Sequence, residues 1–331
     1  MWQTVKYWLR FFIQPSNDGY IQNDWWKLIM QIIDGKKTAS DIREELKKEI
    51  SDLFQRGGKV PGLVAILVGE NPASQIYVKS KGKACEEIGM LHKTEILPND
   101  ISEEKLLQVI DHYNNDDKYH GILVQLPLPK HINEDKIIEA IKPEKDVDGF
   151  HPINVGRLVI GKDALRSCTP GGIQELLKRY KIETKGKHVV IVGRSNIVGK
   201  PIANIMVQKE EFANSIVTVC HSAAKDLSYY TKQADILIAA IGKPEFITGE
   251  MVNDNVVIID VGINRVEDKT NKKGYRVVGD VKFDEVSKKC SYITPVPGGV
   301  GPMTIAMLLK NTYKAFKNLV DKNELYRYKK N

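Results

Sequence analysis

The sequence has few cysteines, and none of them stands in a metal-binding or redox pattern. Its 331 residues include only Cys85, Cys168, Cys220 and Cys290, which are far apart and form no CxxC pair. Most lie in apolar or strand-like surroundings, as buried thiols do in a reducing cytoplasm. His221 adjoins Cys220, but no second ligand pair follows at zinc spacing. We therefore expect a cytoplasmic protein with no metal site.

The sequence also lacks a long hydrophobic run and any concentration of charge of one sign. The formal net charge of +7 is spread along the chain, which is a weak reason to expect nucleic acid but suits anionic small molecules. No segment has a signal-peptide core, and the apolar run at 8–13, broken by Arg10, is too short to span a bilayer. We expect neither a nucleic-acid nor a membrane partner.

Tryptophan is absent after residue 26, which sets the N-terminal segment apart from the rest. This break in composition predicts that residues 1–29 are an extension outside the fold. The favoured interpretation is that translation begins at Met30, immediately before the strand-like segment 31–34. The alternative is that the aromatic and basic residues of this segment rest on a membrane surface.

From residue 30 onward, apolar strand-like runs alternate with amphipathic helical segments, the pattern of parallel sheets covered on both faces. The expected strands are 63–69, 92–96 (at an edge), 121–126, 188–193, 216–220, 236–241 and 256–261. In the first half, helices are expected near 38–56, 72–88, 102–114 and 133–141.

This alternation predicts an α/β protein of two domains with a cleft between them. The first comprises 30–148 plus 296–320, because a helix at about 303–319 is expected to return to it. The second comprises 149–295, and residues 321–331 are expected to form a frayed tail.

Residues 189–201 have the pattern of a buried strand, a glycine turn and the start of a helix. The spacing is Gly193-x-Ser195-x-x-x-Gly199, not the strict G-x-G-x-x-G. Such a turn lets main-chain N–H groups and the helix N-terminus hold a pyrophosphate. A purely structural turn is the alternative. The segment favours a Rossmann-type, doubly wound dinucleotide-binding domain.

The next strand indicates which dinucleotide is bound. An NAD site usually ends this strand in a carboxylate that accepts hydrogen bonds from the ribose 2′-hydroxyl. Here strand 216–220 ends in His221-Ser222, and Arg194 lies in the first turn. Cationic and neutral donors tolerate a 2′-phosphate that a carboxylate would repel. We therefore predict NADP.

A lysine stands on the inward side of the helix expected at 71–89. Asn71 and Pro72 suit its start and Gly89 its end. At helical spacing, Tyr77 and Lys81 share a face with Ala84, Cys85 and Ile88. An ammonium group on the inward side must be paired with another group, must reach water at the end of its aliphatic chain, or must have a lowered pKa that suits it to proton transfer. The alternative is an ordinary lysine at the helix edge.

Three further segments place polar or flexible groups after strands or at the domain boundary. Gln125 lies in an apolar run and needs partners, although a core glutamine bonded to main chain is common. Asp146 and Asp148 stand at the boundary, where a turn or cap is the alternative role. The loop Pro295-Val-Pro-Gly-Gly-Val-Gly-Pro302 lets a flat ligand approach the main chain, or is a plain connector. One pocket could combine Lys81, Tyr77, Gln125 and Asp148.

Residues 30 to about 320 resemble the bifunctional methylenetetrahydrofolate dehydrogenase/methenyltetrahydrofolate cyclohydrolase family. The resemblance is carried, in order, by segments 74–81, 121–129, 145–149, 168–170, 193–199, 218–222, 260–264 and 295–304. Two departures affect cofactor preference more than chemistry: the longer connection at 209–215 and Ala223-Ala224 after Ser222.

The resemblance implies a role for each candidate residue. Lys81 would be the key catalytic lysine, Gln125 would hydrogen-bond it, Tyr77 would pack on the pterin, and Asp148 would anchor the pterin ring. The dinucleotide site would comprise Gly193, Arg194, Ser195, Ser222 and Ile263, and the folate pocket wall Pro297, Gly298 and Gly299. It also implies a homodimer with tetrahydrofolate derivatives as substrates.

The expected activity is oxidation of 5,10-methylenetetrahydrofolate with NADP, then hydrolysis of the methenyl product to 10-formyltetrahydrofolate. Three alternatives remain at this stage: a monofunctional dehydrogenase without cyclohydrolase activity, a different NADP reductase, and a non-catalytic folate- or nucleotide-binding protein.

Overall fold

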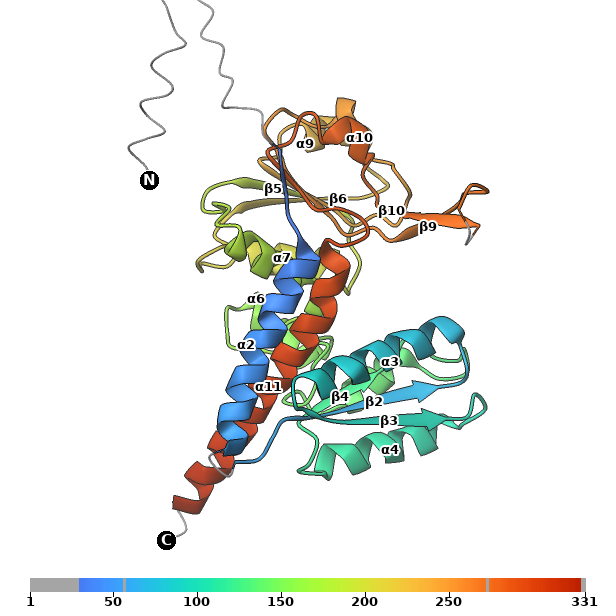
Figure 1. Ribbon diagram of the computed structural model, residues 1–331, viewed down its shortest axis with the longest axis vertical. Coiled ribbons are helices and arrows are strands. Elements are labelled where there is room, and N and C mark those ends of the chain that lie inside the picture. The colour runs from blue at the N-terminus through green and yellow to red at the C-terminus, as the bar shows by residue number, and fades with distance from the viewer. Residues whose placement is uncertain (1–29, 56–57, 272–273, 329–331) are drawn as a thin grey trace, which may run out of the picture.

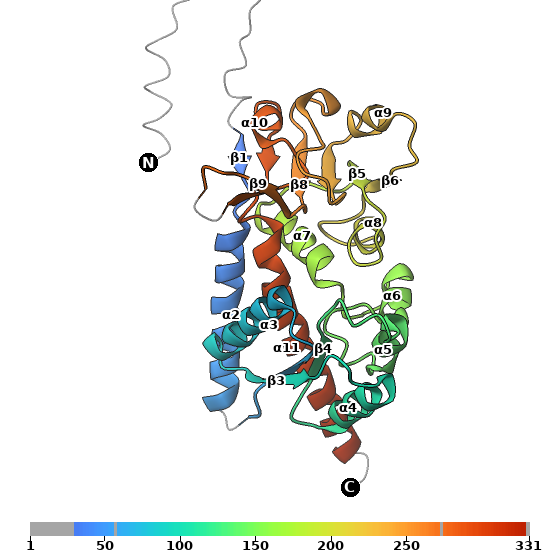
Figure 2. The ribbon, with the colours of Figure 1, turned by 90° about the vertical axis from the view of Figure 1, so that its right-hand side faces the viewer.

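The computed structural model describes residues 30–55, 58–271 and 274–328, and side chains as far as residue 320. The predicted extension at 1–29 lies outside the described residues. Two α/β lobes lie along two long helices that pack side by side, α2 (Gly35–Gln55) and α11 (Val300–Tyr328) (Figure 1). Figure 2 shows the same stacking of the lobes after a quarter turn.

The first lobe contains a three-stranded parallel sheet in the order β3-β2-β4. The central strand β2 (Gly62–Val68) is apolar and buried throughout. Alternate side chains of this strand point to opposite faces of the sheet. Leu63 packs with α2 and α3 (Pro72–Glu87). Val64 packs on the other face with α4 (Glu103–Asn115) and α5 (Glu134–Ala140). The polar strand β3 (Leu91–Leu97) is an edge, as predicted, and β4 (Gly121–Val124) is the other edge.

The second lobe contains a six-stranded parallel sheet in the order β1-β11-β8-β7-β5-β6. The order reverses at β5, which is the switch point of a doubly wound sheet. The strands are β1 (Gln31–Ile32), β5 (His188–Val192), β6 (Ile216–Cys220), β7 (Ile236–Ala239), β8 (Val257–Asp260) and β11 (Tyr292–Ile293).

Shorter elements surround this sheet. An antiparallel hairpin, β9 (Asn264–Glu267) and β10 (Tyr275–Val278), projects to the right in Figure 1. The helices are α6 (Pro152–Val159), α7 (Cys168–Arg179), α8 (Gly199–Met206), α9 (Leu227–Thr231), α10 (Phe283–Val286) and the 3-10 turn η2 (Gly249–Met251). The predicted α/β class is confirmed.

The structure differs from the sequence-based expectation at both ends of the described chain. The sequence places β1 in the first lobe, but this strand pairs with β11 in the sheet of the second. The sequence also predicts a frayed tail at 321–331, but α11 continues to Tyr328, since no glycine or proline interrupts this stretch of helix-forming residues. A local hydrophobic pattern predicts neither the pairing of β1 with a strand distant in the sequence nor the point at which the last helix ends.

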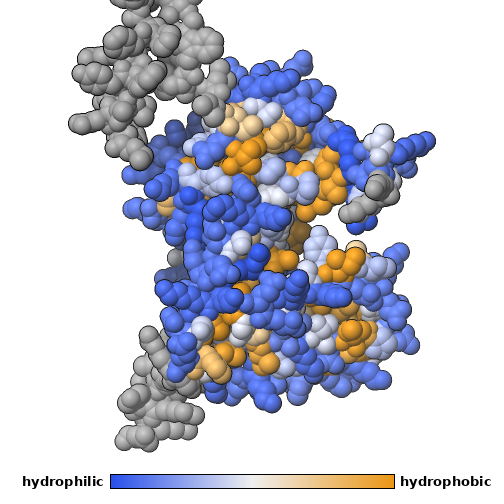
Figure 3. All heavy atoms as spheres, in the orientation of Figure 1, coloured by the Kyte–Doolittle hydropathy of each residue, from blue (hydrophilic) through white to orange (hydrophobic). Residues whose placement is uncertain are grey.

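One apolar cluster runs through both lobes. It includes Leu63 and Ala84 of the first lobe, Val189 and Ile173 of the second, and Met303 of α11. Figure 3 shows the surface hollowed between the two lobes on the right-hand side. Of the helices in the described part of the chain, none combines the length and apolar character required to cross a membrane.

Candidate functional site

Lys81 lies on α3, whose ends are where the sequence predicts them. Asn71 Oδ1 accepts hydrogen bonds from the main-chain N–H groups of Ala73 (3.0 Å) and Ser74 (3.1 Å), which have no partner within the helix. Gly89 adopts φ = +79°, a conformation that suits glycine just beyond a helix. The cap and the stop therefore set where the helix that carries Lys81 begins and ends.

The inward face of α3 differs from the prediction at one residue. Lys81 is only 9% exposed, whereas Tyr77, predicted for the same face, is 51% exposed. Val78 takes the buried position in that turn. The Tyr77 ring is therefore available to a ligand one turn before the lysine.

Gln125 follows β4 directly and is bonded to Lys81. Its Oε1 accepts a hydrogen bond from Lys81 Nζ at 3.0 Å, and its Nε2 donates to the Leu126 carbonyl at 2.8 Å. Because the Leu126 carbonyl occupies the amide N–H, the amide oxygen faces the ammonium. The structure thus brings together the amine and the amide from two separate segments.

The two boundary carboxylates have different surroundings. Asp146 accepts hydrogen bonds from the main-chain N–H groups of Gly149 (3.1 Å), Phe150 (3.3 Å) and His151 (2.9 Å), and from Asn154 Nδ2 (2.9 Å). It is therefore a turn-forming residue. No hydrogen bond to the Asp148 carboxylate is found within the described residues.

Burial raises the pKa of Asp148 from its ordinary 3.8 to about 6. The positive charge of Lys81 lowers this pKa and the negative charge of Asp146 raises it, and burial is the largest effect. Lys81 is thus close enough to Asp148 for its charge to influence the carboxyl, and the same lysine is bonded to Gln125. A carboxyl whose pKa is perturbed by burial and by a nearby charge is typical of a functional site.

The loop at 295–299 packs against the start of α2. The Gly298 carbonyl accepts a hydrogen bond from Lys36 N at 2.9 Å. A Cβ on Gly35 would lie 1.8 Å from the Gly299 oxygen, so the two segments touch main chain to main chain. The Val296–Pro297 peptide is cis. Within the described residues, no hydrogen bond joins this loop to Lys81, Gln125 or Asp148.

A second candidate site lies at the carboxyl ends of β5, β6 and β7. A cavity of about 480 Å³ is lined by Gly193, Arg194, Ser195 and Ser222, the residues predicted for the dinucleotide. Ile263 does not line it; this side chain is 57% exposed and lies near Gly301 at the start of α11. Its cofactor role stays a prediction.

The turn after β5 requires glycine at both glycine positions of the motif. A Cβ on Gly193, where φ is +135°, would lie 2.1 Å from the Ala240 oxygen. One on Gly199 would lie 2.2 Å from the Gly193 oxygen. Ser195 Oγ accepts hydrogen bonds from Val198 N (3.1 Å) and Gly199 N (3.3 Å), which closes the turn.

Sequence reasoning missed Lys243, Phe246 and Asp280 in this region. Lys243 and Phe246 line the cavity, and the lysine Nζ lies 5.3 Å from the centre of the phenylalanine ring. The fully buried Asp280 accepts hydrogen bonds from the N–H groups of Ile241 (2.6 Å), which lines the cavity, and of Gly242 (2.9 Å). The position of 241–246 directly after β7 was the available signal, because carboxyl ends of parallel strands form ligand sites.

Two family models match the chain. Residues 33–148 match the model of the tetrahydrofolate dehydrogenase/cyclohydrolase catalytic domain, and residues 167–320 match the NAD(P)-binding domain of the same family. The chain belongs to the tetrahydrofolate dehydrogenase/cyclohydrolase family. The resemblance carried by the sequence motifs is thereby confirmed. The family match places 296–320 with the NAD(P)-binding domain, whereas the sequence prediction placed it with the catalytic domain.

Individual relatives cover nearly the same part of the chain. The bifunctional protein FolD of Chloroherpeton thalassium is 60% identical over 293 residues, which are 88% of this chain and 100% of that protein. The crystal structure of FolD from Campylobacter jejuni is 52% identical with a TM-score of 0.83, covering 88% of this chain and 99% of that one. A Trypanosoma brucei FolD structure, complexed with NADP cofactor and inhibitor, is 40% identical with a TM-score of 0.82, covering 88% and 98%.

Proposed function

We propose that the protein oxidises 5,10-methylenetetrahydrofolate to 5,10-methenyltetrahydrofolate with NADP and then hydrolyses this product to 10-formyltetrahydrofolate. The observation that carries the proposal is the 3.0 Å bond between Lys81 Nζ and Gln125 Oε1, together with the half-buried carboxyl of Asp148, whose pKa the charge of Lys81 influences. Family membership connects this arrangement to folate, and the bifunctional FolD relatives support both activities.

The second cavity suits NADP. Main chain approaches main chain at Gly193, so a pyrophosphate can lie against N–H groups without meeting a side chain. None of the described residues that line the cavity is a carboxylate, while Arg194 and Lys243 supply positive charge for a 2′-phosphate. When bound, NADP supplies the acceptor for the hydride.

The oxidation requires mainly alignment, because the folate nitrogens stabilise the developing cation. We assign the alignment of the folate with the cofactor to residues at the edges of the cleft. The exposed ring of Tyr77 would pack on the pterin, and Pro297, Gly298 and Gly299 would form a wall with little side-chain bulk. Asp148 would accept hydrogen bonds from the N–H groups of the pterin.

The hydrolysis requires proton movement, which we assign to Lys81. Water adds to the methenyl carbon, the bond from that carbon to one folate nitrogen breaks, and one proton is released overall. Lys81 would exchange protons with the water and the departing nitrogen, or stabilise the charge between them. Gln125 would hold the amine in place, because its own amide is oriented by the Leu126 carbonyl.

We also propose that the protein is a cytoplasmic homodimer. β6 is an edge strand with exposed Ile216 and Val219, which supports contact with a second copy. The four cysteines are free and buried, which supports a reducing compartment. Light scattering on the purified protein should give the mass of two chains; the mass of one chain would contradict the dimer.

The test of the activity is one assay with two readouts. Purified protein with 5,10-methylenetetrahydrofolate and NADP should generate NADPH fluorescence. Separately supplied methenyltetrahydrofolate should lose its absorbance faster than in buffer. NADPH formation without faster hydrolysis would indicate a monofunctional dehydrogenase, and the absence of both signals would refute the proposal. Substituting NAD for NADP tests the cofactor assignment.

A further inference from the structure

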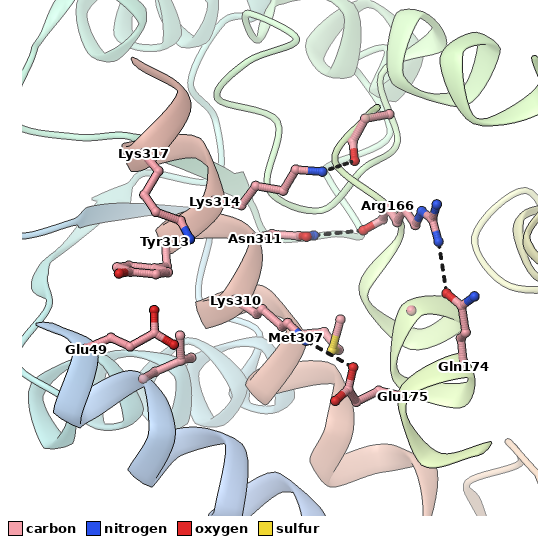
Figure 4. A pocket seen from close by; sticks show the side chains of 13 residues that line it. Glu49, Arg166, Gln174, Glu175, Met307, Lys310, Asn311, Tyr313, Lys314 and Lys317 are labelled. Atoms are coloured by element: carbon pink, nitrogen blue, oxygen red, sulfur yellow. Dashed lines mark hydrogen bonds and ion pairs between the residues drawn. The ribbon is translucent and has the colours of Figure 1, made fainter. Parts of the chain in front are cut away.

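A buried side chain on α11 is bonded to both chain segments that surround Asp148. Asn311 is 6% exposed, and its Nδ2 donates hydrogen bonds to the carbonyls of Val147 (2.8 Å) and Arg166 (2.8 Å). Figure 4 shows Asn311 extending from α11 toward Arg166, at the border of a cavity of about 350 Å³. The same nitrogen also lies 3.7 Å from Cys168 Sγ, but an amide nitrogen carries only two hydrogens, and the two carbonyls are the nearer acceptors.

The two segments are packed tightly against each other. Cys168 Sγ donates to the Val147 carbonyl at 3.3 Å, and Ser167 Oγ donates to the Gly149 carbonyl at 3.3 Å. Gly149 has φ = +72°, and a Cβ there would lie 2.5 Å from Ser167 N. The main chain on either side of Asp148 is therefore held to residues 166–168, and Asn311 bonds to both segments.

The carboxylate of Asp148 has no hydrogen bond of its own in the described part of the chain, so its position depends on this main chain. We infer that Asn311 is a positioning residue, which holds the main chain that carries Asp148 by fixing the carbonyls of Val147 and Arg166. The inference rests on the proposed function, in which Asp148 binds the pterin. The inference adds a residue of α11 to the site, and this helix packs on both α2 and α7.

The test compares Asn311→Ala with a matched variant of the next residue. Thr312 is also buried on α11, but its Oγ1 donates to the Leu308 carbonyl of the same helix, so Thr312→Val removes no hydrogen bond to residues 147–168. KM values for folate substrate and NADP are measured for both variants. Asn311→Ala is also made in an Asp148→Ala background, because residues that act through each other have non-additive effects.

Asn311→Ala should raise the folate KM about tenfold and leave the NADP KM within about twofold, whereas Thr312→Val should change neither. In the Asp148→Ala background, the effect of Asn311→Ala on the folate KM should fall below about twofold. An unchanged folate KM, an equal rise in the NADP KM, or the same loss in both backgrounds would overturn the inference.

A readout independent of turnover separates this inference from the proposed function. Ionisation of Asp148 should make the free energy of unfolding depend on pH. Its contribution is measured as the difference in free energy of unfolding between wild type and Asp148→Asn, compared at two pH values. Asn311→Ala should reduce it by freeing the carboxyl to reach water, even if folate is not turned over. An undiminished dependence would contradict the inference, whereas an inactive wild type would contradict only the proposed function.

Discussion

Replacing Asp148 with asparagine should stabilise the folded protein while it weakens folate binding. The carboxyl is held in a site that disfavours its ionised form, since burial raises its pKa from 3.8 to about 6. At neutral pH the native state therefore carries an ionised group that would be more stable in the unfolded chain. Asparagine keeps the shape and removes the charge.

The magnitude follows from the pKa difference at about 1.4 kcal/mol per unit. The folded pKa is the higher one, so this contribution to stability is complete below about pH 4 and is lost as the pH rises through about 6. Asp148→Asn should exceed wild type in free energy of unfolding by about 2 kcal/mol at pH 5 and by about 3 kcal/mol at pH 8. These are upper values, because the carboxyl retains some contact with water.

Urea unfolding at pH 5 and pH 8 measures both differences. Asp146→Asn is the matched control: its carboxylate accepts four hydrogen bonds, so this variant should be less stable than wild type by about 1–3 kcal/mol. The reasoning fails if Asp148→Asn is less stable than wild type at pH 8, or if its advantage does not grow between the two pH values.

Three further substitutions test the remaining parts of the two sites. Lys81→Met should abolish methenyltetrahydrofolate hydrolysis, measured as loss of absorbance, and leave the NADP dissociation constant unchanged. Gly193→Ala should weaken NADP binding at least about tenfold in a calorimetric titration, because a Cβ would lie 2.1 Å from the Ala240 oxygen. Asp280→Ala should lower both stability, by about 2–4 kcal/mol, and NADP affinity, because the N–H groups of Ile241 and Gly242 lose their acceptor.

Two of these variants have close controls. Lys83 lies on the exposed side of α3, so Lys83→Met should retain hydrolysis. Loss of hydrolysis in Lys83→Met would contradict a specific role for Lys81. Gly186 also has a positive φ (+72°), but a Cβ there would meet no atom within 4 Å, so Gly186→Ala should affect stability without affecting NADP affinity. Equal loss of NADP affinity in both glycine variants would contradict the steric argument.

Local sequence patterns predicted the secondary structure around both sites. The start and end of α3 follow from Asn71, Pro72 and Gly89, because caps and stops act within a few residues. The continuous apolar run of β2 predicts a strand buried on both faces. The turn after β5 is equally local. Such features need no information about distant parts of the chain.

Other features depended on contacts that no local pattern encodes. β1 pairs with β11, although the two strands lie near opposite ends of the sequence. Tyr77 is exposed, although it stands one helical turn before the buried Lys81. Lys243 and Asp280 belong to the dinucleotide wall only because β7 lies next to β5. Their residue types alone carry no such signal.

The sequence by itself determined the α/β alternation, the dinucleotide turn, and the family to which the chain belongs. Only the tertiary structure showed that the Asp146 carboxylate is bonded within the turn, and that Asn311 is bonded to the carbonyl of Val147, 164 residues earlier in the chain. The physical reason is that propensities and caps act over a few residues. Burial, ionisation and hydrogen-bond partners are instead set by whichever segments the fold brings together.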